Sequence, residues 1–137
     1  MFGLQIRYLS FFFGLISVLS FFNLIYSYYL NLYLNLDTYY FSLIISLIIS
    51  LVFYNIKTIE KKPNLYNKIL TVFFGYLLLP LILSIPFYFS IYNLTFLNSY
   101  FESISGFTST GFTIFENIKN IDQSLILWRS STQWIGG

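Results

Sequence analysis

The sequence consists of long uncharged stretches separated by short polar connections. Acidic and basic residues are absent from three intervals, between Arg7 and Asp37, between Asp37 and Lys57, and between Lys68 and Glu102. Each interval exceeds the roughly 18 apolar residues that indicate a transmembrane helix. The predicted transmembrane spans are residues 8–30, 38–56 and 69–92.

The third predicted span contains two prolines, Pro80 and Pro86, in the stretch YLLLPLILSIPFYFS. Each proline lacks a backbone N–H, so each removes one hydrogen bond from the helix. Either the helix bends at these positions, or neighbouring helices satisfy the freed carbonyls and the prolines are simply tolerated. The sequence leaves both interpretations open.

A short helix is predicted over residues 98–106, where the stretch NSYFES begins a more polar pattern. Ser99 followed three residues later by Glu102 fits a capping box, with Asn98 as an alternative N-cap. Gly106 suits the left-handed conformation that follows many helix C-termini. A helix of about two turns is too short to cross a bilayer.

The residues after this helix, 107–113, are mostly small and hydroxylated, and none is acidic. A short helix followed by such a segment suits a re-entrant pore loop, because backbone at membrane depth must line a water-filled cavity. In this interpretation the carbonyls of Thr110 and Gly111 replace the hydration shell of a monovalent cation, and the hydroxyls of Thr110 and Thr113 add ligands or brace the loop. A polar external loop is the alternative. Apolar residues argue against it: Phe101, Ile104, Phe107, Phe112, Ile114 and Phe115.

An outer connection, 114–123, is expected to lead into a further helix, 124–137, with Asp122 as its N-cap candidate. Arg129 then lies about 10 Å along this helix. It either snorkels or braces the structure, or it lies near a pore mouth, packing against another repeat or holding an acidic partner such as Glu102. Glu102 itself is interpreted as a capping residue or as an electrostatic lure for cations.

Basic residues gather in the connection 57–68, KTIEKKPNLYNK, which holds four lysines against one glutamate. The opposite loop, between the first two spans, holds Asp37 and no basic residue. Cytoplasmic loops carry an excess of Lys and Arg, so this connection and the N-terminus are predicted to be cytoplasmic. The hairpin within residues 1–56 then turns on the outside.

Composition supports an all-α integral membrane protein, with 57% hydrophobic and 9% charged residues in 137. Cys and His are both absent, which removes thiolate chemistry and the commonest general base and metal ligand. No nucleophile and base pair is apparent, so an enzyme is not expected. The basic residues form no stripe with stacking aromatics, and no nucleic-acid partner is expected.

Three motifs resemble the Trk/Ktr/HKT superfamily of potassium transporters, and specifically its bacterial Trk-type membrane subunit. They are SIPF, YFESISGFTSTGFT and LILWRSSTQWIGG, which are similar in order to the first pore-forming helix, the first pore loop and the start of the next helix. The resemblance implies that residues 69–137 form a first pore unit with a selectivity filter. The implied filter residues are Thr108, Ser109, Thr110, Gly111, Phe112 and Thr113. Glu102, Ser105, Gly106 and Arg129 would support them.

The resemblance further implies uptake of potassium, or of sodium, as a transported ion without a covalently bound cofactor. It implies a bacterial inner (plasma) membrane location, a homodimer, and a cytosolic nucleotide-binding regulatory subunit. The family builds its pore from four such units in one polypeptide, whereas this sequence contains a single pore-loop motif. We therefore expect an N-terminal fragment, with a truncated last helix, that needs the remaining pore repeats. The alternative is a non-transporting membrane adaptor or assembly protein.

Overall fold

The computed structural model describes residues 5–56 and 64–137, so most of the basic connection, 57–63, lies outside the described residues. Within these ranges the chain forms helices and no β-strand. Three helical spans are long and apolar enough to cross a membrane, which confirms the predicted all-α membrane fold. These spans are Ile6–Tyr29, Leu36–Asn55 and Leu65–Tyr88.

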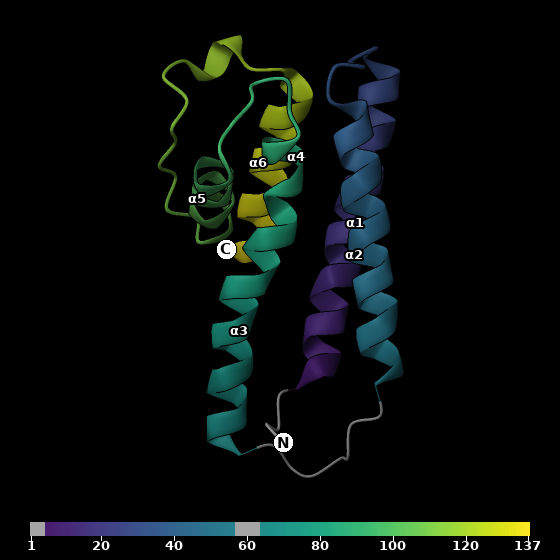
Figure 1. The fold of residues 1–137 in the computed structure, drawn as a ribbon, viewed down its shortest axis with the longest axis vertical. Helices are drawn as coiled ribbons and strands as arrows, with labels where there is room; N and C mark the ends of the chain where they lie inside the picture. Colours follow the sequence, from purple (N-terminus) through teal and green to yellow (C-terminus); the bar gives the residue numbers. More distant parts are fainter. Residues whose placement is uncertain (1–4, 57–63) are drawn as a thin grey trace.

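The first two helices, α1 (Ile6–Tyr29) and α2 (Leu36–Asn55), form an antiparallel hairpin (Figure 1). Small polar side chains lie along their interface: Ser10 Oγ donates to the Ser50 carbonyl and Ser50 Oγ to the Ser10 carbonyl, each at 2.9 Å. Ser20 and Ser42 bond through their hydroxyls at 3.1 Å. Small residues let two membrane helices approach closely, and their hydroxyls satisfy one another in the absence of water.

The third span is interrupted at Ser84, between α3 (Leu65–Leu83) and the single-turn helix α4 (Ile85–Tyr88). Pro80 lies in the last turn of α3, and Pro86 lies at the start of α4, where a missing N–H costs least. The two prolines therefore flank a break rather than distort one continuous helix. The helix also begins at Leu65, four residues earlier than predicted, and ends before the predicted residue 92.

The chain between α4 and the last helix, α6 (Gln123–Gly136), leaves one end of the molecule and returns to it (Figure 1). Its deepest part is α5 (Phe96–Phe107), which Figure 1 shows nearly end-on, across the long helices. The ring of Phe107 lies 5.2 Å from that of Tyr76, the twelfth residue of the 24-residue third span. The C-terminus of α5 is thus halfway along a membrane-spanning helix. A short 3-10 helix, η1 (Ile118–Asn120), precedes α6.

The core forms where the N-terminal hairpin meets α4 and α6. Tyr39, Phe87 and Trp128 are fully buried there, and the Tyr39 and Trp128 rings are 5.9 Å apart. The polar atoms of both residues are satisfied, because Trp128 Nε1 donates to the Leu83 carbonyl at 3.0 Å and the Tyr39 hydroxyl bonds that of Ser124 at 2.9 Å. Aromatic residues whose polar atoms have hydrogen-bond partners can be buried completely.

Asn35, in the turn between α1 and α2, links the hairpin to the connections that precede α5 and α6. Its side chain is 1% exposed. The amide nitrogen donates to Asp122 Oδ2 at 2.9 Å, and the amide oxygen accepts from the Ile91 N–H at 3.1 Å. One side chain thereby satisfies groups on both connections that flank the α5 segment.

We predict that Asn35→Leu lowers the free energy of unfolding by about 1–3 kcal/mol, because it leaves the Ile91 N–H and an Asp122 oxygen unpaired. The control is Asn55→Leu, the same change at an exposed residue whose amide bonds the Leu51 carbonyl of its own helix and no other described residue. Unfolding in mixed detergent micelles, followed by tryptophan fluorescence, measures both. Equal losses in the two variants would contradict the role assigned to Asn35.

Candidate pore loop

The helix α5 begins earlier than the sequence suggested, and its N-cap is Thr95. The Thr95 backbone is extended, with φ −64° and ψ 157°, and its Oγ1 accepts from the Asn98 N–H at 3.3 Å. The predicted N-caps, Ser99 and Asn98, were wrong: both lie inside the helix, and Ser99 Oγ donates to the Thr95 carbonyl at 3.0 Å. Threonine is a favoured N-cap residue, so Thr95 itself was the signal that the sequence reasoning missed.

Gly106 also has a different role from the predicted one. It lies within α5, and the left-handed residue after the helix is Ser109, with φ 53°. A Cβ on Gly106 would collide with Thr132 Oγ1 on α6, and one on Gly136 would overlap the Phe107 carbonyl. These two glycines are therefore required by the close contact of α5 with α6, not by the turn between them.

The loop folds back over the C-terminus of α5. The N–H of Thr110 donates to the Ser105 carbonyl at 3.0 Å, and Ser105 Oγ donates to the Phe112 carbonyl at 2.6 Å. The hydroxyls of Thr108 and Thr110 bond at 2.6 Å. Carbonyls that a helix C-terminus leaves without partners are satisfied in this way, so the loop and the helix form one unit.

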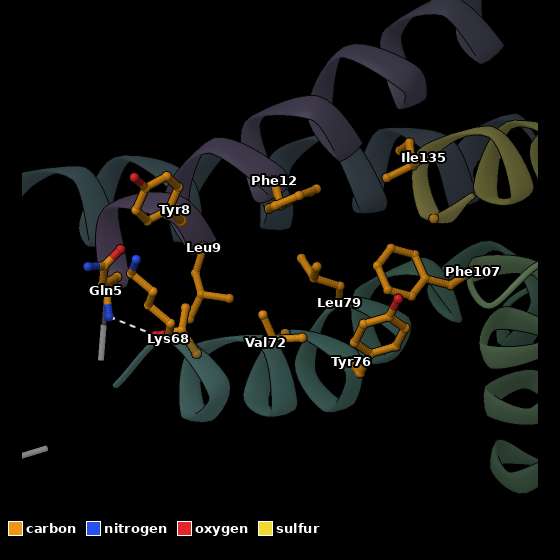
Figure 2. Close-up of a pocket in the computed structure, with 13 residues that line it drawn as sticks. Gln5, Tyr8, Leu9, Phe12, Lys68, Val72, Tyr76, Leu79, Phe107 and Ile135 are labelled. Atoms are coloured by element: carbon orange, nitrogen blue, oxygen red, sulfur yellow. Dashed lines mark hydrogen bonds between the residues drawn. The ribbon is translucent and has the colours of Figure 1, made fainter. Parts of the chain in front are cut away.

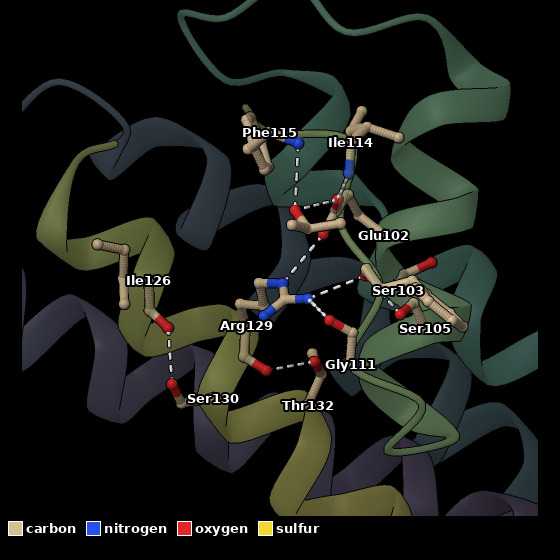
Figure 3. A network of polar contacts seen from close by, with 12 residues as sticks. Glu102, Ser103, Ser105, Gly111, Ile114, Phe115, Ile126, Arg129, Ser130 and Thr132 are labelled. Atoms are coloured by element: carbon tan, nitrogen blue, oxygen red, sulfur yellow. Dashed lines mark hydrogen bonds and ion pairs between the residues drawn. The ribbon is translucent and has the colours of Figure 1, made fainter. Parts of the chain in front are cut away.

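Glu102 anchors the far side of this loop (Figure 3). Its side chain is 0% exposed. One carboxylate oxygen accepts from the Thr113 hydroxyl at 2.6 Å and from the Ile114 N–H at 2.5 Å, and the other accepts from Arg129 Nε at 3.0 Å. Glu102 is neither the predicted capping residue nor an exposed lure for cations. The sequence could not show this, because its partners lie 11 to 27 positions away.

Arg129 has the acidic partner Glu102, which was one of the two roles predicted for it. Besides its ion pair with Glu102, its Nη2 donates to the carbonyls of Gly111 and Phe112 at 3.2 and 3.0 Å. Its side chain is 14% exposed, so it braces the loop from α6 rather than snorkelling to an interface. A carbonyl beside a guanidinium is a poor cation ligand. The prediction that the Gly111 carbonyl faces a bound cation therefore does not fit this contact.

The opposite side of the loop is uncovered. Residues 108–112 are all exposed, Phe112 to 68%. Gly111 has φ +83°, and nothing lies within 4 Å of the position of an added Cβ. Thr113, by contrast, is held against Glu102, so its hydroxyl braces the loop and is not free to bind an ion. The predicted filter residues thus divide into an exposed strip, 108–112, and an anchored end at Thr113.

Comparison with known proteins finds partial relatives among cation transporters. The chain is 34% identical over 80 residues to an uncharacterized cation transporter of Methanocaldococcus jannaschii, a match that covers 58% of this chain and 17% of that protein. It is 42% identical over 59 residues to the Trk system potassium uptake protein TrkI of Halomonas elongata. That match covers 43% of this chain and 11% of TrkI. It is 38% identical over 55 residues to the Trk system potassium uptake protein TrkH of Escherichia coli. That match covers 39% of this chain and 11% of TrkH.

These relatives confirm the resemblance to Trk-type transporters. The matched stretch spans less than one fifth of the length of each of the three relatives. No protein-family model matches the chain. No solved structure matches it either.

We predict that Glu102→Gln and Arg129→Gln each destabilise the folded chain by about 2–4 kcal/mol, because each leaves a largely buried charge without its partner. The double variant should lose less than the sum, with a coupling energy of about 1–3 kcal/mol. Unfolding free energies in detergent micelles complete this double-mutant cycle. Additive losses would contradict a direct ion pair.

Proposed function

We infer that this chain belongs with the Trk-type transporters and that its segment 96–113 supplies one pore-loop unit of a potassium uptake pathway. The proposal rests on three supports: the partial relatives, two of which are named potassium uptake proteins; the re-entrant course of the segment; and the geometry of the loop. The observation that carries it is the exposed strip 108–112, which follows a helix ending halfway along a transmembrane span.

Exposed backbone at this depth is stable only where it lines water or further protein, because lipid cannot satisfy its polar groups. The loop is anchored on one side by Glu102 and Arg129 and is uncovered on the other. An uncovered side is the side that would face an ion path. We propose that the Thr110 carbonyl contributes to cation coordination there, while Gly111 contributes its left-handed backbone rather than its own carbonyl oxygen.

The ion pair makes this arrangement electrostatically suitable for a monovalent cation. Arg129 alone would repel a cation from the loop, but Glu102 lies against it at 3.0 Å, and the pair carries no net charge. Residues 107–113 contain no acidic or basic side chain. The field along the exposed strip then comes from peptide dipoles, which bind weakly enough for an ion to leave again.

A single loop encloses no pore, so we propose that this unit works together with three similar units around a common axis. Trp134, 78% exposed at the end of α6, and Phe112 are apolar side chains that neighbouring units would cover. The cytoplasmic position of the N-terminus, a homodimer and a nucleotide-binding regulatory subunit remain proposals that derive from the resemblance and from the lysines of residues 57–68.

The test is a chimera in which residues 65–137 replace the aligned segment of a Trk-type potassium uptake protein, expressed in a bacterium that lacks its own potassium uptake. We predict growth at low potassium and rubidium uptake above that of the empty strain. A chimera that reaches the membrane intact yet transports nothing would favour the adaptor alternative over a pore unit.

In that chimera, Gly111→Ala should lower the preference for potassium over sodium by about tenfold. A Cβ at a left-handed position costs roughly 1–2 kcal/mol, which distorts the strip. Gly75→Ala is the matched control, because within residues 65–137 its Cβ would make an ordinary contact of 3.9 Å with Leu79. Competition uptake at fixed potassium and increasing sodium measures the preference. Unchanged selectivity would place the filter elsewhere.

A further inference from the structure

A cavity of about 570 Å³ lies between α1 and α3, and the ends of α5 and α6 close it at one end (Figure 2). The ion pair and the hydrogen bonds that hold the pore loop lie outside it, although Phe107 and Gly136, where α5 meets α6, belong to its lining. Glu102 and Arg129 are absent from its lining, and so is the exposed strip 108–112. The cavity is therefore a separate feature of the fold that the proposed function does not explain.

The lining changes in character along the cavity (Figure 2). Gln5, Tyr8, Lys68 and Thr71 line one end, where the Gln5 N–H donates to Thr71 Oγ1 at 2.9 Å. The walls beyond this end are apolar. They include Leu9, Phe12, Val72, Leu79 and Ile135. Among the described residues of the lining, Lys68 alone carries a formal charge.

The cavity has the depth of one membrane leaflet. Gln5 precedes the first residue of α1, and Lys68 lies in the first turn of α3, so the polar end coincides with the ends of two membrane-spanning helices. Leu79 lies eleven residues further along α3, which is about 16 Å at 1.5 Å per residue. The hydrocarbon core of a bilayer is about 30 Å thick, so one leaflet contributes about 15 Å.

We propose that this cavity binds one anionic phospholipid, with an acyl chain along the apolar walls and the phosphate at Lys68. The charge of the polar end selects the headgroup, because a lysine binds phosphate as a point charge and the described part of the lining contains no carboxylate. Basic pockets between membrane helices are recognised sites for anionic headgroups. No step of this inference requires potassium transport.

The experiment uses the 137-residue chain purified in a mild detergent and mixed with phosphatidylglycerol or with phosphatidylcholine of the same acyl chains. Native mass spectrometry counts the lipids retained per chain. We expect one retained phosphatidylglycerol, favoured about fivefold over phosphatidylcholine, which corresponds to the contribution of one lysine near a headgroup. Equal retention of the two lipids would overturn the proposal.

Two pairs of variants distinguish the contribution of the headgroup to binding from that of the acyl chain. Lys68→Gln should remove the preference for phosphatidylglycerol, whereas Lys119→Gln, the same change in the exposed η1 segment, should leave it intact. Gly75→Leu should abolish retention of both lipids by filling the cavity, whereas Gly75→Ala should retain them. Equal effects within either pair would overturn the assignment.

A measurement on the unaltered chain tests the proposal even if one of these variants fails to fold. Phosphatidylglycerol with a photoreactive group near the end of its acyl chain should label the apolar end of the cavity, at Leu79, Phe107 or Ile135. Labelling confined to the exposed face of α2, at residues such as Ile44 and Leu51, would indicate ordinary bilayer lipid and overturn the proposal.

Discussion

The geometry of the re-entrant segment depends on the ion pair between Glu102 and Arg129. An isolated charge at membrane depth is expensive, and each of these residues makes the other tolerable. Together they also satisfy the groups that an irregular backbone would otherwise leave unpaired, namely the Ile114 N–H and the carbonyls of Gly111 and Phe112. A non-helical segment can therefore lie far from both ends of the transmembrane spans, because this pair supplies its hydrogen-bond partners. It also joins α5 to α6 by a contact in which the carboxylate is fully buried.

A second constraint acts where the turn of the α1–α2 hairpin meets the re-entrant unit. The contacts here are hydrogen bonds of buried polar side chains, because the faces of membrane helices gain little by leaving lipid for one another. Asn35 holds both connections that flank α5, and Tyr39 reaches Ser124 at the start of α6. Displacing the hairpin would therefore move the start of α6, and Arg129 two turns further along it. The position of the loop therefore depends on the hairpin through α6. Among the described residues, no hydrogen bond joins the hairpin directly to the exposed strip.

The transmembrane spans and the short helix could be predicted from the sequence, because each depends on a local property. Uncharged length determines a span. The short helix was predicted at nearly the right place but from the wrong end signals, because its N-cap is Thr95 and Gly106 lies inside it. The roles of Glu102, Gly106 and Arg129 could be predicted only in part, because they depend on contacts between residues far apart in the sequence. Glycine is the residue type expected just after a helix end. Gly106 is instead required to be small by Thr132, which lies on α6, more than twenty residues later in the sequence. Arg129 likewise determines which side of the loop carries free carbonyls, because it binds the Gly111 carbonyl on the other side. The local sequence does not predict the orientation of Arg129.

The serine contacts between α1 and α2 have a consequence for the order of assembly. Ser10, Ser20, Ser42 and Ser50 satisfy one another within the hairpin and use no group of the later helices. The two helices are joined by a turn of six residues, so bringing them together costs little chain entropy. The hairpin can therefore pair as soon as both helices are inserted, before the re-entrant segment has been synthesised. The irregular segment then folds against a surface that already exists, which shortens the time its polar backbone spends unpaired in the membrane.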